Sequence, residues 1–133
     1  MRLAFLRADH GGAAIEFAIV APVLFLIVLG MVDFGRLFYV TQGLQYATQK
    51  AARYYTLNPT AATSSVTTQL TQAMVGNWGS SVNVAYADTT SCNANSNVTC
   101  TTITATCPFT FLVGYLGTGS RTLTATSEAI RSN

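Results

Sequence analysis

The stretch GGAAIEFAIVAPVLFLIVLGMV, residues 11–32, decides the fold of this chain. Its apolar core from Ile15 to Val32 would extend roughly 27 Å as a helix, which nearly matches the hydrocarbon thickness of a bilayer. Arg2 and Arg7 precede it, and basic residues before a span favour a cytoplasmic N-terminus. We therefore expect a single membrane-spanning helix, with the remainder of the chain on the extracytoplasmic side.

A cleaved secretory signal peptide is the alternative interpretation of the same stretch. A signal peptide has a short apolar core followed by small residues at a cleavage site. Here the apolar core is followed by Asp33-Phe34-Gly35-Arg36 and shows no good A-x-A site. We therefore favour a retained anchor over a removed signal.

Two residues inside the apolar stretch need an explanation. Glu16 places a carboxylate at the start of the span, although a charge near lipid is costly. Pro22 lacks a backbone N–H, which kinks or breaks a helix unless neighbouring groups satisfy the freed carbonyl. Pro22 is compatible with a mild kink, or with a segment that bends or melts locally when helices pack together.

The composition excludes several classes of function. Only 9% of the 133 residues are charged and the net charge is +2, which is too small to indicate nucleic-acid binding. His10 is the only histidine, so a Ser-His-Asp triad and a zinc site are both disfavoured. Asp88 and Glu128, the two carboxylates after residue 56, are a thin basis for acid–base chemistry. We expect neither an enzyme nor a cofactor.

Beyond Val32 the apolar pattern becomes one-sided, which predicts that the helix continues from Asp33 to about Leu57 and packs on a globular head. Asn58-Pro59 should end it. Arg36 is placed to pair with Asp33 or with lipid phosphates. The predicted packing stripe consists of Phe34, Leu37, Phe38, Leu44, Ala47, Ala51 and Tyr55.

The remaining residues predict a small α+β head. Residues 60–76 resemble a second helix whose apolar face is Val66, Leu70, Ala73 and Met74, with Gly76 able to cap it. Three β candidates follow: the alternating residues 82–86, the Thr- and Val-rich residues 98–111, and residues 123–130. We expect them to form a three-stranded antiparallel sheet packed on the helices.

The three cysteines allow one disulfide. Cys100 and Cys107 would lie roughly 23 Å apart on one strand, too far to bridge. Cys92 and Cys100 flank a turn and could meet across a hairpin. We predict Cys92–Cys100, with Cys92–Cys107 as the second choice and three unpaired thiols as the alternative to both.

These residues together resemble the TadE-like pseudopilins of tight-adherence (Tad/Flp) pilus systems. The resemblance is specific in the N-terminal third and looser over residues 56–106. A supporting pattern lies near the C-terminus, in residues 108–112, 123–126 and 129–131. The positions that carry the N-terminal resemblance are Gly11, Gly12, Ala14, Glu16-Phe17-Ala18, Pro22, Gly30, Asp33-Phe34-Gly35-Arg36 and Ala51-Ala52-Arg53.

The resemblance implies processing by a membrane prepilin peptidase that cuts between Gly11 and Gly12, which makes Glu16 the fifth residue of the mature chain. The new α-amino group could then pair with Glu16 of a neighbouring subunit in a low-dielectric setting. Implied segments are a leader at residues 1–11, a transmembrane helix at 12–32, its extracytoplasmic continuation at 33–57 and a pilin-like α+β head at 58–133.

The function implied by the resemblance is that of a minor pseudopilin-like subunit in the biogenesis of a Tad/Flp pilus, supporting adhesion and surface colonisation. Its partners would be the inner membrane, the prepilin peptidase, other pilins or pseudopilins and the Tad assembly machinery. The alternative is a monomeric, membrane-anchored extracytoplasmic binding module. A weaker third possibility is a secreted soluble protein.

Overall fold

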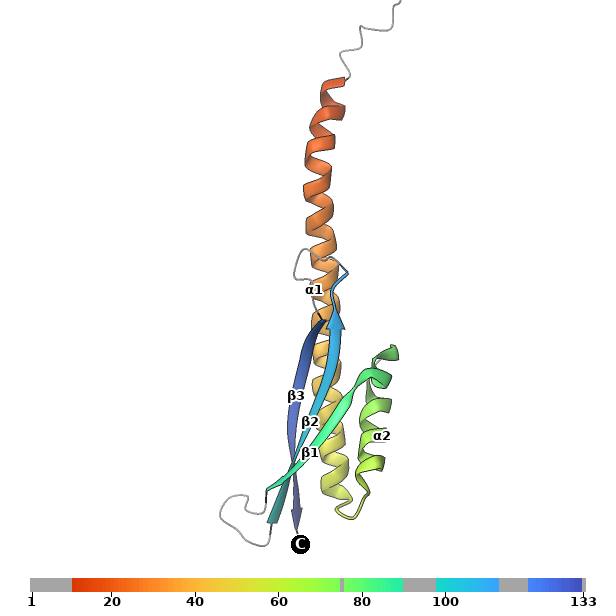
Figure 1. The fold of residues 1–133 in the computed structure, drawn as a ribbon, viewed down its shortest axis with the longest axis vertical. Helices are drawn as coiled ribbons and strands as arrows, with labels where there is room; N and C mark the ends of the chain where they lie inside the picture. The colour runs from red at the N-terminus through yellow and green to blue at the C-terminus, as the bar shows by residue number, and fades with distance from the viewer. Residues whose placement is uncertain (1–10, 75, 90–97, 113–119, 133) are drawn as a thin grey trace, which may run out of the picture.

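The structure is a computed structural model that describes residues 11–74, 76–89, 98–112 and 120–132. The order of its elements is α1, α2, the 3-10 helix η1, and strands β1, β2 and β3. Figure 1 shows one long helix, α1, with the sheet and α2 gathered around its C-terminal half. The predicted α+β architecture of a long apolar helix, a second helix and a three-stranded antiparallel sheet is confirmed.

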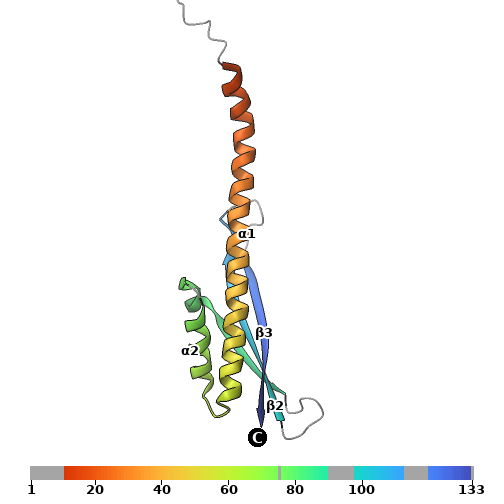
Figure 2. The same ribbon diagram turned by 180° about the vertical axis from the view of Figure 1, so that it is seen from behind.

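Helix α1 runs unbroken from Gly11 to Leu57, 47 residues, and passes through Pro22. Its two halves lie in different surroundings. We call residues 11–32 the apolar half, which projects beyond the sheet and α2 in Figures 1 and 2. We call residues 33–57 the head half, which contacts α2, β2 and β3. The helix ends beside Asn58, whose backbone N–H and side-chain amide both donate to the Tyr54 carbonyl.

Helix α2 spans Thr63–Ala73, and η1 follows at Gly76–Ser81. The predicted apolar face is correct, because Val66 and Leu70 are buried completely and Met74 almost so. The predicted cap at Gly76 is wrong. Met74 is the C-cap, and its N–H donates to the Leu70 carbonyl. Gly76 instead has φ +75° and begins η1, a left-handed conformation that glycine adopts without strain.

The sheet has the order β1-β2-β3, with both pairs antiparallel. Strand β1 spans Asn83–Thr89, β2 spans Val98–Thr110 and β3 spans Ser120–Ser132. Strand β1 pairs with β2 only as far as Thr106, whereas β3 follows β2 to Thr110. Pro108 therefore lies where β2 has one neighbour, a position at which its missing N–H is tolerated.

The hydrophobic core lies between the head half of α1, α2 and one face of the sheet. Strand alternation sends Ile103, Ala105, Cys107 and Phe109 toward the helices, and all four are fully buried. The other sheet face carries threonines, such as those at 104 and 126, which are register partners. Helix α1 contributes Val40, Leu44, Ala47, Ala51, Ala52 and Tyr55 to the core.

The predicted packing stripe of α1 is correct toward its C-terminal end and wrong toward its N-terminal end. Phe34 and Phe38 are 58% and 67% exposed, although the sequence prediction placed them against the head. The buried row instead runs from Asp33 through Leu37 and Val40 to Leu44, at steps of four, three and four residues. A buried carboxylate therefore occupies the place that the sequence pattern assigned to an aromatic ring.

Candidate functional site

The apolar half of α1 presents its side chains outward. Gly11, Gly12, Glu16 and Phe17 are all exposed on its first turns, with Phe17 67% exposed. A Cβ built on Gly11 or Gly12 would meet nothing within 4 Å. The predicted processing residues therefore lie together at the free end of α1 and contact no other element of the described chain.

Pro22, which was predicted to kink or bend the span, and Gly30, one of the positions of the TadE-like resemblance, lie within the same continuous helix. Pro22 produces no break in α1. A Cβ at Gly30 would meet nothing within 4 Å, so no contact within the described residues requires a glycine there. Whether these positions serve helix packing between subunits stays a prediction.

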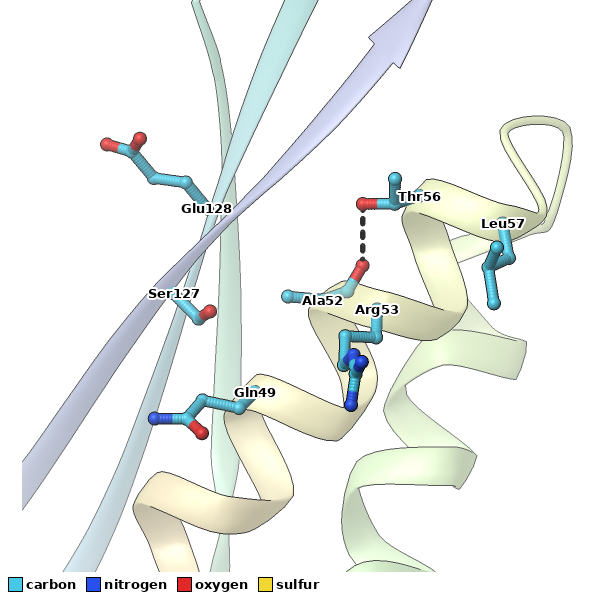
Figure 3. A pocket seen from close by; sticks show the side chains of 7 residues that line it. All are labelled: Gln49, Ala52, Arg53, Thr56, Leu57, Ser127 and Glu128. Carbon is cyan, nitrogen blue, oxygen red and sulfur yellow. Dashed lines mark hydrogen bonds between the residues drawn. The ribbon is translucent and has the colours of Figure 1, made fainter.

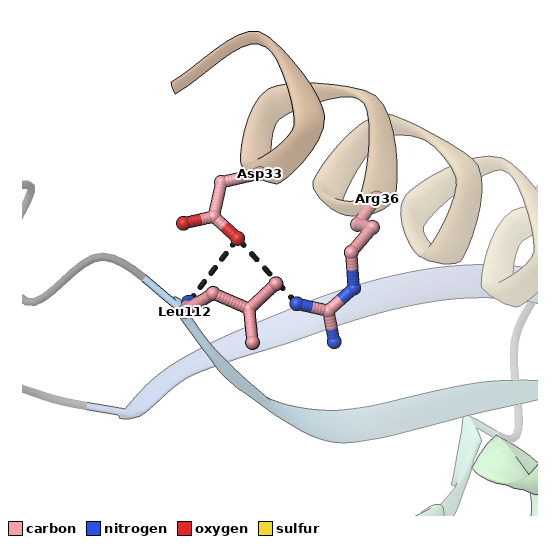
Figure 4. Close-up of polar contacts among 3 residues, drawn as sticks. All are labelled: Asp33, Arg36 and Leu112. Atoms are coloured by element: carbon pink, nitrogen blue, oxygen red, sulfur yellow. Dashed lines mark hydrogen bonds and ion pairs between the residues drawn. The ribbon is translucent and has the colours of Figure 1, made fainter. Parts of the chain in front are cut away.

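Asp33 lies at the point where α1 meets the head, and its side chain is 0% exposed. Its Oδ1 accepts the backbone N–H of Leu112 at 3.1 Å and a hydrogen bond from Arg36 Nη1 at 3.4 Å (Figure 4). The Leu112 bond joins residues 79 apart in sequence. A buried carboxylate is stable only when paired and hydrogen-bonded, and Asp33 meets both conditions.

Arg36 connects this contact to the aromatic part of the core. Its guanidinium carbon lies 5.6 Å from the centroid of the Phe109 ring, and its side chain is 36% exposed. Phe109 in turn stacks on Trp78 of η1 at 5.9 Å and meets Phe111 edge-on at 5.2 Å. The junction formed by Asp33, Arg36 and Leu112 thus fixes the end of β2 to α1.

The Asp33–Arg36 pairing was one of two predictions for Arg36, and the structure contains it. The fixed position of Leu112 was not predicted. No periodic pattern indicated it, because Leu112 lies two residues beyond Thr110, the last residue of β2, and donates through its backbone. Phe34 and Gly35, which lie between Asp33 and Arg36 in the sequence, are exposed.

A second polar cluster lies at the far end of the head. Arg131 Nη1 donates to the Tyr55 hydroxyl at 2.7 Å, and its guanidinium carbon lies 4.9 Å from the Tyr55 ring centroid. Tyr86 donates its hydroxyl to the Thr63 carbonyl at 3.1 Å and shares a 2.8 Å hydrogen bond with Thr67. Burial raises the pKa of Tyr86; the Thr67 hydrogen bond lowers it in part, and nearby Tyr55 raises it.

A surface groove of about 490 Å³ runs between the end of α1 and β3 (Figure 3). Within its lining, Thr56 Oγ1 donates to the Ala52 carbonyl at 3.0 Å. Arg53 and Glu128 line it, yet within the described residues they form no ion pair. The lining offers neither a nucleophile paired with a base nor a set of metal ligands. No group of three or more His, Cys, Asp or Glu side chains lies together in the described ranges.

The cysteines differ in state. Cys100 is disulfide-bonded, whereas Cys107 is a buried free thiol whose pKa is raised by burial. Cys107 faces the core from β2, so it serves as a small apolar residue there. Cys92 lies outside the described residues, and the Cys92–Cys100 pairing stays a prediction.

The fold and the junction define a class: an α+β head carried on one helix that is long and apolar enough to cross a membrane. Within this class, the family model described as TadE-like protein matches residues 11–53. Over that segment, which includes the whole apolar half, the junction positions 33–36 and most of the head half, the chain is similar to TadE-like proteins. The match associates the chain with the Tad pilus system. No curated protein and no solved structure matches the chain.

Proposed function

We propose that this chain is a minor pseudopilin-like subunit that takes part in the biogenesis of a Tad/Flp pilus and thereby supports adhesion and surface colonisation. One observation carries the proposal. The TadE-like match over residues 11–53 includes Gly11, Gly12 and Glu16, which lie on the first described turns of α1. Glu16 then lies in the second helical turn of an exposed apolar surface that contacts nothing else in the described chain.

Processing follows from this arrangement. A prepilin peptidase in the inner membrane cuts between Gly11 and Gly12, where two glycines lower the cost of unwinding the first turn of α1 into an extended substrate. The cut removes Arg2 and Arg7 and leaves an α-amino group near Glu16. In an assembly of parallel helices, that ammonium pairs with Glu16 of a neighbour and offsets the cost of placing a carboxylate near lipid.

The proposed placement is a single pass through the inner membrane, with the N-terminus cytoplasmic and the head extracytoplasmic. The exposed apolar half is suited both to the membrane-anchored state and to the assembled state. Its side chains first face lipid and afterwards face the helices of other pilins or pseudopilins held by the Tad assembly machinery. The alternative, a monomeric membrane-anchored binding module, would use the same anchor but would need neither the cut nor helix–helix contact.

Co-expression with a prepilin peptidase, followed by intact-mass measurement of the membrane-extracted chain, tests the proposal. We expect a mature chain that begins at Gly12, and loss of the cut in Gly11→Leu. Gly30→Leu is the matched control, because a Cβ there meets nothing within 4 Å and the cut should be retained. A chain that keeps Met1 in the presence of active peptidase would contradict processing and favour the monomeric module.

A further inference from the structure

Beyond pilus assembly, the junction indicates how the head sits on the membrane. We infer that the end of β2 forms a second membrane contact, in which Leu112, Phe34 and the half-buried Phe111 enter the lipid interface and Arg36 and Arg121 face lipid phosphates. We call these five residues the junction surface. The inference rests on the apolar half of α1 lying in the bilayer, and it goes beyond pilin function because a monomeric module would share it.

The hydrogen bond between Leu112 and Asp33 sets the height of this surface. Asp33 directly follows Val32, the last residue of the apolar half, so it marks the level at which α1 leaves the hydrocarbon. The Leu112 N–H lies 3.1 Å from the Asp33 carboxylate. Figure 4 shows Leu112 bonded to Asp33, so Leu112 and the end of β2 are held at the level of Asp33.

The apolar side chains near Asp33 are more exposed than is favourable for side chains in contact with water. Leu112 is 68% exposed and Phe34 is 58% exposed, although Asp33, which precedes Phe34 in sequence and accepts the Leu112 N–H, is fully buried. Phe34 and Phe111 also line a hollow of about 440 Å³ that Leu37, Arg121, Thr122 and Leu123 complete. Aromatic and aliphatic side chains next to a membrane span are typical of the lipid interface, where their burial is favourable.

The positive charges of the junction surface are also complementary to a lipid surface. Arg36 leaves part of its guanidinium free, since one nitrogen pairs with Asp33 while the side chain remains 36% exposed. Arg121 lies opposite Phe109 in the β2–β3 register, its side chain is exposed, and it forms no ion pair with the described residues. Two cations beside exposed apolar side chains at the membrane exit fit anionic phosphates, and Asp33 is already satisfied and buried.

Depth-dependent quenching of tryptophan tests the contact. The full chain would be reconstituted in vesicles of phosphatidylethanolamine and phosphatidylglycerol that contain lipids brominated high on the acyl chain. With Trp78 replaced by phenylalanine, three single-tryptophan variants are compared: Leu112→Trp, Phe25→Trp in the apolar half, and Ile130→Trp. Ile130 is a matched control, since it is 57% exposed but lies at the opposite end of the sheet, near Cys100.

We expect the bromolipids to quench Leu112→Trp and Phe25→Trp and to leave Ile130→Trp unchanged. Arg121→Gln in the Leu112→Trp chain should weaken the quenching. Quenching of Phe25→Trp alone would overturn the second contact while leaving the anchor intact. Absence of quenching at Phe25 would overturn the membrane placement itself, a result that intact-mass analysis of processing does not duplicate.

Because Trp78 stacks on Phe109, its replacement could unfold the head, and a measurement on the unaltered chain removes this ambiguity. A gadolinium chelate attached to lipid headgroups broadens amide resonances that lie near the membrane surface. We expect broadening of the Leu112 amide, which Asp33 holds in place, and no broadening of the Ile130 amide. Equal broadening of the two amides, or broadening of neither, would overturn the inference.

Discussion

The two halves of α1 belong to one continuous helix yet follow different rules. In the apolar half, Phe25 and Leu29 are exposed although they are as apolar as any core residue. In the head half, Leu44 and Ala51 are buried while Gln45 and Lys50 face outward. A helix that is apolar all round requires an apolar medium, whereas a one-sided helix requires only a neighbour on one side.

Asp33 separates the two regimes. The same position ends the apolar half, begins the buried row and receives the end of β2 through Leu112. The boundary between the two halves is therefore marked by a specific tertiary contact at Asp33 as well as by a change in composition. Each prediction below alters one side of the boundary and uses the other side as its control.

The largest effect is expected from charges in the middle of the apolar half. Leu26→Arg combined with Ile27→Arg should release the chain from membranes, because each arginine at a span centre costs about 2.5–3.5 kcal/mol. Sodium carbonate extraction measures the release. Tyr46→Arg combined with Leu57→Arg is the control, since both residues are exposed in the head half and the chain should remain in the membrane pellet. Retention of the first variant in the pellet would break the comparison.

A cavity in the head half should destabilise the head, whereas the same change in the apolar half should not. Leu44→Ala removes a side chain that is 1% exposed, and we expect it to lower the free energy of unfolding of the head by about 2–5 kcal/mol. Urea unfolding in detergent micelles, followed by emission of the single tryptophan, Trp78, measures the loss. Leu29→Ala, in the apolar half, should leave the urea midpoint unchanged. Equal loss in both variants would show that the halves unfold as one unit.

Removal of the boundary carboxylate should have an intermediate effect. Asp33→Ala deletes the acceptor for Leu112 and the partner of Arg36, and we expect a loss of about 1.5–3 kcal/mol in head stability. The partial exposure of Arg36 places most of that loss on the Leu112 bond. Asp88→Ala is the control in the same urea assay. It removes a single hydrogen bond, which the buried Thr101 hydroxyl donates to the exposed Asp88 carboxylate, and it should cost less than Asp33→Ala, about 1 kcal/mol.

The smallest effect concerns alkaline pH. Because the pKa of Tyr86 is raised in the folded head, unfolding releases its proton more easily above pH 10.0, the ordinary tyrosine value. Head stability should therefore be complete below that value and fall as the pH rises through the folded pKa. Tyr86→Phe should remove this part of the decline in urea midpoints measured between pH 9 and pH 12.

Thr67→Val sharpens the same measurement. Its hydroxyl lowers the pKa of Tyr86, so its loss should raise that pKa further and steepen the alkaline decline. A decline that is identical in the native chain and in both variants would contradict the assignment to Tyr86.

Much of the architecture could be predicted from the sequence because its signals are local. The apolar run identified the exposed half, and Asn58-Pro59 marked the end of α1. Alternation in residues 82–86 and the Thr- and Val-rich run 98–111 located two of the three predicted strands, and the antiparallel pairing of all three is confirmed. The errors lie where distant segments meet. Phe34 was predicted to be buried and Asp33 was not, because the backbone N–H of Leu112, which helps to stabilise the buried carboxylate, comes from a segment 79 residues away in sequence.

In the candidate site, too, local contacts could be predicted from the sequence and contacts between distant segments could not. Pairing of Asp33 with Arg36 follows from helical spacing and was within reach of the sequence. The contact of Arg36 with Phe109 depends on the register of β2 against the helix, which periodicity alone does not specify. The roles of Gly11, Gly12 and Glu16 depend on partners outside the chain, so they rest on the TadE-like match and on the proposed test.

The central claim is that one helix lies in two solvents with its boundary at Asp33. Hydrogen exchange followed by mass spectrometry, on the full chain in lipid nanodiscs over a series of urea concentrations, tests it most directly. We expect amides of residues 37–57 to lose protection together with the head, while those of residues 17–32 stay protected at every concentration. Loss of protection in both halves at the same urea concentration would contradict the claim.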